Sequence, residues 1–130
     1  MEKKLYREEL TQMEINAHRA SLNGEPAVYC GTYGKYNNGD ISGMWVDVAS
    51  FTDYEEFMEF CERVHADEED VELMFQDYEG FPYAWYSESG MGEETFDRIK
   101  EFAALDNDKR EAYEAYLDNY DSEASVEDFN

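Results

Sequence analysis

The sequence predicts an α+β protein, in which a small three-stranded antiparallel sheet with one helix is followed by a helical domain and preceded by an extra N-terminal helix. Two observations carry this prediction. Segments 27–33, 43–48 and 71–78 are rich in β-forming residues, whereas only helical apolar spacing follows Tyr86. With 42% hydrophobic and 16% aromatic residues, the 130-residue chain can also bury a core. The expected units are residues 1–24, 25–86 and 87–130.

The N-terminal segment has apolar residues spaced by three and four, which line one face of a helix. We expect an amphipathic helix over residues 4–22, ended by Asn23-Gly24 and Pro26. This helix either docks on the core of its own chain or packs against another copy. Its apolar face consists of Tyr6, Leu10, Met13, Ala17 and Ala20.

The first two strands are expected to form a hairpin, because the polar segment between them contains the turn signal Asn38-Gly39. Thr52-Asp53-Tyr54-Glu55 fits a capping box, which would start a helix that runs to about His65. Gly80 and Pro82 close the third strand.

Helices are expected over residues 93–105 and 108–120, and Ser125-Val126-Glu127-Asp128 is typical of the opening of another helix. The inward face of the first of these helices would hold Phe96, Ile99 and Ala103. The inward face of the second would hold Ala112, Tyr116, Leu117 and Tyr120.

Charge is the property that sets this chain apart. It has 33 acidic and 10 basic residues, a net charge of −23, whereas roughly 2 to 8 units are enough to keep a small domain in solution. Residues 1–24 hold four acidic and four basic residues, so the other 29 acidic and 6 basic residues lie in 25–130. Such a surface attracts basic proteins or cations and repels nucleic acid and anionic membranes. We therefore expect a basic protein partner, and no nucleic-acid or membrane partner.

The expected location is the cytoplasm. The N-terminus has no signal-peptide pattern, and no apolar run approaches the roughly 20 residues of a membrane span. Cys30 and Cys61 stand in neither a CxxC pair nor a metal-ligand spacing, so we interpret them as small core residues in a reducing compartment.

Helical periodicity places the carboxylates in rows, because residues three and four apart share one face of a helix. In the first acidic helix the row lies opposite an apolar stripe of Phe57, Phe60, Cys61 and Val64. A dense acidic cluster also precedes the third strand. The candidate partner-binding carboxylates are Glu55, Glu59, Glu62, Asp67, Glu68, Glu69, Asp70, Glu93, Asp97, Glu101, Glu111, Glu114, Asp118 and Asp121.

Like charges at these spacings destabilise a helix by a few tenths of a kcal/mol per pair, and the lysines that would relieve this are mostly missing. Duplex DNA carries one charge per ~1.7 Å of its axis, so a net charge of −23 corresponds to roughly 40 Å of duplex. A rigid acidic protein of this kind would compete with DNA for a basic cleft. An acidic helix face is usually only a solvated surface, and a halophilic or cation-buffering protein would have much of the same composition.

No residue pattern typical of catalysis is evident, so we expect neither an enzyme nor a bound metal or cofactor. Gly34-Lys35 lacks the other residues of a phosphate-binding loop, and Asp106-Asn107-Asp108 lacks the later ligands of a calcium loop. His18 and His65 have no second nitrogen or sulfur ligand at a recognised spacing. An enzyme that uses His65 with nearby carboxylates remains an alternative, which His65→Ala would test.

Two long strings point to a known family. They are Pro26-Ala27-Val28-Tyr29-Cys30-Gly31-Thr32-Tyr33-Gly34-Lys35-Tyr36-Asn37-Asn38-Gly39 and Leu73-Met74-Phe75-Gln76-Asp77-Tyr78-Glu79-Gly80-Phe81-Pro82. Through them residues 26–130 resemble the N-terminal and central regions of ArdA antirestriction proteins. The resemblance implies a DNA mimic, usually from a mobile genetic element, that blocks Type I restriction-modification enzymes in the host cytoplasm by occupying their DNA groove. It also implies an elongated dimer with a small α+β domain, a helical domain and a further α+β domain.

The sequence departs from that family pattern in two places. It ends near Phe129, where the family would continue into its third domain, and it begins with the extra segment 4–22. Because the family's dimer contacts lie largely toward the C-terminal part, one hypothesis is that the N-terminal helix supplies a different homodimer surface. A second hypothesis is that the chain inhibits another DNA-binding defence or regulatory protein, or is an acidic interaction module that binds a basic protein without imitating DNA.

Overall fold

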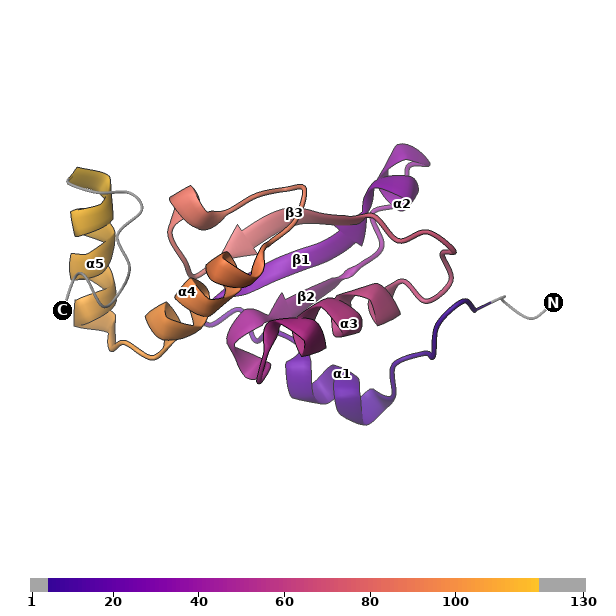
Figure 1. The fold of residues 1–130 in the computed structure, drawn as a ribbon, viewed down its shortest axis with the longest axis horizontal. Helices are drawn as coiled ribbons and strands as arrows, with labels where there is room; N and C mark the ends of the chain where they lie inside the picture. The colour runs from indigo at the N-terminus through magenta and orange to yellow at the C-terminus, as the bar shows by residue number, and fades with distance from the viewer. Residues whose placement is uncertain (1–4, 120–130) are drawn as a thin grey trace.

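The computed structural model describes the backbone of residues 5–119 and the side chains of residues 5–115. It confirms the α+β prediction, because a three-stranded antiparallel sheet is combined with helices that precede and follow it (Figure 1). The helix expected to open at Ser125-Val126-Glu127-Asp128 lies outside the described residues. The strands are β1 (Ala27–Thr32), β2 (Met44–Asp47) and β3 (Leu73–Glu79), in the order β2-β1-β3.

The central strand β1 pairs antiparallel with both neighbours. Val28 lies opposite Val46 on one side and opposite Tyr78 on the other. The register with β3 shifts between Tyr29 and Cys30, which is a bulge. Except for Tyr29, the residues of β1 are buried, as expected for the middle strand of a small sheet.

The first hairpin is confirmed, although its connection contains a short helix, α2 (Tyr33–Asn37), capped by the Thr32 hydroxyl. Gly39 follows it with a φ of +78°, a conformation that favours glycine. Where the chain returns to β2, a side chain at Gly43 would collide with the carbonyl of Cys30. Only glycine therefore lets the two strands approach at this point.

Two helices cover one face of the sheet (Figure 1). They are α3 (Tyr54–Val64) and α4 (Glu93–Ala103). The predicted capping box is displaced by one residue, because Asp53 caps α3 by accepting from the N–H of Glu56 at 2.8 Å. The inward face of α4 is Phe96, Ile99 and Phe102, whereas the expected Ala103 is only partly buried.

The prediction of a helix over 4–22 is wrong in its extent, since α1 covers only Gln12–His18. It starts late because Thr11 and Glu14 form a capping box, in which each backbone N–H donates to the other side chain at 3.1 Å.

The helix also ends early because the chain turns to extend the sheet. Arg19 bridges to Val46 at the outer edge of β2, and the N–H of Ala20 donates to the carbonyl of Trp45 at 3.1 Å. This pairing provides hydrogen-bond partners for backbone groups of β2 that would otherwise lie at an open sheet edge.

The predicted apolar face is confirmed only at Leu10, which packs against the core, because α1 itself has no buried residue and Met13 is 81% exposed. The aromatic contact of α1 with the body comes from His18. Its ring stacks on Phe51 at 4.0 Å between centroids and meets the edge of Phe60 at 5.0 Å.

The last described helix is α5 (Asn107–Asn119). Asp106 accepts from the N–H of Lys109 at 2.9 Å. The segment Asp106-Asn107-Asp108, which resembled the start of a calcium loop, thus begins a helix. Among the α5 residues whose side chains are described, the expected inward residue Ala112 is exposed and Tyr113 is buried against Trp85 and Phe102. The expected inward side chains of Tyr116, Leu117 and Tyr120 lie outside the described residues.

One hydrophobic cluster joins the sheet, α3, α4 and α5. The short 3-10 helices η1 (Val48–Ser50) and η2 (Tyr83–Trp85) also contribute to it, through Val48 and Trp85. The division into units 25–86 and 87–130 stays a prediction.

Replacement of the fully buried Tyr113 by alanine is expected to destabilise the protein by about 3 kcal/mol or more, because it leaves a cavity between Trp85 and Phe102. Chemical denaturation measures the change. The control is Tyr36→Ala, at a side chain that is 51% exposed, for which a change within about 0.5 kcal/mol is expected. Equal effects of the two substitutions would contradict the packing of α5 described above.

Candidate partner-binding surface

The outer face of α3 carries the first predicted row of carboxylates. Burial of Phe57, Phe60 and Cys61 turns the opposite side of the helix outward. The α3 row is Glu55 and Glu59, both exposed, and Glu62, partly buried.

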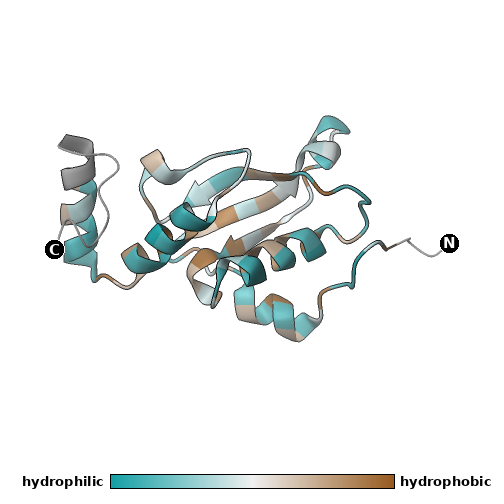
Figure 2. Cartoon of the chain, viewed as in Figure 1, coloured by the Kyte–Doolittle hydropathy of each residue, from teal (hydrophilic) through white to brown (hydrophobic). Residues whose placement is uncertain are grey.

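A second row lies on the neighbouring helix. The α4 row is Glu93, Asp97 and Glu101, all exposed. Phe57 of α3 stacks on Phe96 of α4, with ring centroids 5.4 Å apart, and the Tyr54 hydroxyl donates to the carbonyl of Met91 at 2.6 Å. Figure 2 shows hydrophilic residues on these helices in front of hydrophobic strands. The core therefore holds both rows on one rigid support.

The basic residues near these rows are mostly bound to the chain itself. Lys100 donates to the carbonyl of Thr52 at 3.1 Å, and Arg98 pairs with Glu94 at 3.1 Å. The other cations held by internal side-chain contacts are Arg7, Lys35, Arg63 and Arg110. Within the described part of the chain, no carboxylate of the α3 row or the α4 row has an ion pair.

Arg63, a cation in the same helix as the α3 row, fastens the N-terminal segment to α3. The sequence did not reveal this role. Its guanidinium donates to the carboxylate of Glu14 at 2.6 and 2.9 Å and to the carbonyls of Glu8 and Glu9. The hydrogen bond from Arg63, helped by the backbone N–H of Thr11, lowers the pKa of Glu14 to about 2. Arg63 thus serves the fold more than it neutralises the α3 row.

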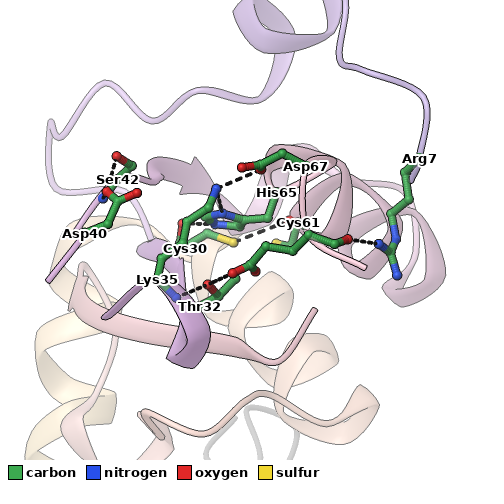
Figure 3. Close-up of polar contacts among 10 residues, drawn as sticks. Arg7, Cys30, Thr32, Lys35, Asp40, Ser42, Cys61, His65 and Asp67 are labelled. Carbon is green, nitrogen blue, oxygen red and sulfur yellow. Dashed lines mark hydrogen bonds and ion pairs between the residues drawn. The ribbon is translucent and has the colours of Figure 1, made fainter. Parts of the chain in front are cut away.

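The acidic cluster before β3 divides into two parts. Asp67 accepts from Lys35 at 2.9 Å, and Glu68 accepts from the Thr32 hydroxyl at 3.0 Å (Figure 3). Glu69 and Asp70 are exposed and have no ion pair among the described residues. Asp67 and Glu68 therefore brace the loop, and Glu69 and Asp70 face solvent.

The predicted row on α5 is described only in part. Glu111 is exposed and Glu114 is partly buried. Asp118 lies in α5 without a described side chain, and Asp121 lies outside the described residues.

Two acidic residues outside the predicted rows, Glu56 and Glu94, are also exposed. Both lie in the first turn of their helix, where acidic residues are favoured, and this position is a sequence signal that could have identified them.

The one histidine considered as a general base is enclosed. His65 is 1% exposed, Lys35 donates to its Nδ1 at 2.9 Å, and its Nε2–H donates to the carbonyl of Cys30 at 3.0 Å (Figure 3). Both ring nitrogens are thus committed to the fold.

The two cysteines are free thiols in the same interior. A hydrogen bond with Cys61 lowers the pKa of the Cys30 thiol, and burial raises the pKa of Cys61. Neither sulfur is open to a substrate, because both residues are 0% exposed. Among the described residues, no three His, Cys, Asp or Glu side chains are placed to hold a metal ion, and no helix is long and apolar enough to span a membrane.

Comparison with known proteins identifies a family. The model of the family described as "Antirestriction protein (ArdA)" matches residues 28–130, which is most of the 130-residue chain. Neither the curated proteins nor the solved structures gave a match. The matched part contains both acidic rows and the sheet except for Ala27, the first residue of β1, and α1 lies before it.

The contact between Arg63 and Glu14 predicts a stability loss in acid. Because the folded pKa of Glu14, about 2, lies below its ordinary 4.5, its contribution is present above about pH 4.5 and is lost as the pH falls through about 2. An NMR titration of the Glu14 carboxyl carbon measures this pKa, and Arg63→Ala should return it toward the ordinary value. Arg98→Ala, which removes a different ion pair, should leave it unchanged. A titration midpoint near 4.5 in the unsubstituted protein would refute this assignment.

Proposed function

The chain belongs to the ArdA antirestriction family, and on that premise we propose that it is a DNA mimic, which inhibits Type I restriction-modification enzymes by occupying the DNA-binding groove of their methyltransferase core. The proposed site of action is the cytoplasm, where such a groove would meet DNA. The observation that supports this mechanism is the pair of exposed carboxylate rows on α3 and α4, whose nearby cations are bound within the chain.

Rigid presentation is part of the mechanism. Phe57 and Phe96 hold the two helices together, so the carboxylates need little ordering when a groove closes on them. A flexible acidic segment would lose conformational entropy on binding and would gain less affinity from the same charge.

Charge density indicates that several rows act together. A row with one carboxylate per helical turn carries one charge per ~5 to 6 Å of helix axis, whereas duplex DNA carries one per ~1.7 Å. One row is therefore too sparse to imitate a duplex. The α3 row, the α4 row, Glu69 with Asp70, and the acids of α5 together come closer to that density.

We also propose a homodimer, in which α1 would form part of the interface between the two copies. Met13 and Ala17 of α1 are exposed, so this helix still has an open side after docking on the body. Sedimentation of the full chain at increasing concentration tests the idea, and a monomer at high concentration would remove it.

The proposed mechanism is tested by the triple substitution Glu55→Gln, Glu59→Gln and Glu62→Gln. In a competition assay with duplex DNA and a Type I methyltransferase, we expect roughly tenfold weaker inhibition at low salt, because three charge pairs with the basic groove are lost. The slope of log affinity against log salt should fall by up to about 3, at about 0.9 per contact.

The matched control removes an equal number of negative charges outside the two acidic helices. It carries Glu72→Gln, Asp77→Asn and Glu88→Gln, all at exposed residues on or near β3. Equal loss in both variants would mean that net charge and not its arrangement matters. Absence of inhibition by the unsubstituted chain at every salt concentration would overturn the Type I target. Binding that duplex DNA does not compete away would favour an acidic interaction module.

A further inference from the structure

Four aromatic rings gather where the end of β3 meets η2, at the end of the molecule nearer α5 (Figure 1). Tyr78 is at their centre. Its ring stacks on Tyr86 at 4.6 Å and lies 5.2 Å from Phe81 and 6.2 Å from Tyr83, between centroids. Tyr83 is 76% exposed, so the cluster reaches the surface.

Beside this cluster is a hollow of about 250 Å³, lined by Tyr78, Phe81, Pro82, Tyr83 and Glu114. Two of these lining residues, Phe81 and Pro82, are buried. The hollow therefore combines the rings of β3 and η2 with one carboxylate from α5.

The backbone that carries these rings is held firmly. Gly80 has a φ of +81°, and a side chain there would meet the backbone of Glu25. The Tyr86 hydroxyl donates to the carbonyl of Phe75 at 2.5 Å, which fixes the segment that returns along β3. The hollow is thus a built feature of the fold, with little to reorganise on binding.

The lining favours an organic cation. The faces of aromatic rings carry negative potential, and the Glu114 carboxylate adds negative charge beside them, so the lining attracts a cation more than an apolar group. Arg110, one turn before Glu114, does not line the hollow, because it binds Glu25 and the carbonyl of Leu105.

The chain itself uses contacts of this kind elsewhere. Lys100 lies 5.8 Å from the centroid of Phe96, and Arg110 lies 5.7 Å from the centroid of Phe102. Of the two cations, arginine suits the hollow better. Its flat guanidinium is weakly hydrated, stacks on aromatic rings and can meet a carboxylate at the same time.

We propose that this hollow, the Tyr83 hollow, binds an arginine side chain of the partner protein. The inference rests on the proposed function, since a groove that binds DNA presents arginine to phosphates and bases. The hollow would give that arginine a ring face and a carboxylate in place of DNA.

The test uses N-acetylarginine methylamide as the probe and the neutral isostere N-acetylcitrulline methylamide as the matched control ligand. On titration into the ¹⁵N-labelled full chain, the arginine probe should shift the amide signals of Tyr78, Gly80, Phe81 and Tyr83 with one binding constant, and the citrulline probe should not. Tyr83→Leu should weaken this binding about threefold or more, the size expected for one exposed cation–π contact. Tyr83→Phe should retain it, and Tyr36→Leu, at another exposed tyrosine, should leave it unchanged.

Equal shifts with citrulline, or arginine shifts spread over the acidic helices without a maximum at the hollow, would overturn the inference. Either result leaves the α3 and α4 rows free to act as the proposed mimic. Loss of inhibition of the Type I enzyme with arginine binding retained at the hollow would overturn the proposed target instead. The two failures are therefore distinguishable.

Discussion

The contact between Phe57 and Phe96 is the interaction on which the acidic surface depends. It joins α3 to α4, and the ring of Phe75 on β3 also lies beside Phe57, with the two centroids 6.0 Å apart. Each buried phenylalanine contributes roughly 1.5 to 3 kcal/mol, whereas a like-charge pair on a helix costs a few tenths of a kcal/mol. The aromatic core thus outweighs the repulsion between rows, and acidic residues can accumulate outside it without unfolding the helices.

The few cations are used where they hold the chain together. Arg63 ties the N-terminal segment to α3, and Lys35 binds Asp67 and the buried His65. A cation at these positions donates hydrogen bonds to carbonyl and carboxylate oxygens that the fold brings close together. A lysine that extends into solvent would not make these hydrogen bonds. As a consequence, the described cations lie mostly in hydrogen-bonded contacts within the chain, and no carboxylate of the α3 row or the α4 row has an ion pair among the described residues.

Local patterns predicted the three strands, α3, α4 and the two carboxylate rows, because hydrophobic periodicity decides which side of an element faces the core. The family resemblance was likewise visible in the sequence and is confirmed over residues 28–130. The predictions that failed concern features set by contacts between residues far apart in the sequence. The helix expected over 4–22 was shortened because the chain from Arg19 pairs with the edge of β2, and neither Tyr113 as the anchor of α5 nor the Tyr83 hollow has a local signature.

A surface made only of carboxylates would attract every basic groove with the same salt-sensitive strength, so it cannot by itself select one partner. Selection requires contacts that act at short range and at a fixed distance from the charges. The Tyr83 hollow meets both conditions, since a ring and a carboxylate would recognise one side chain and the core cluster connects Phe81 of its lining to α3 and α4. The rows would then govern how fast a basic partner arrives, and the hollow would govern how long a partner with a correctly placed arginine stays.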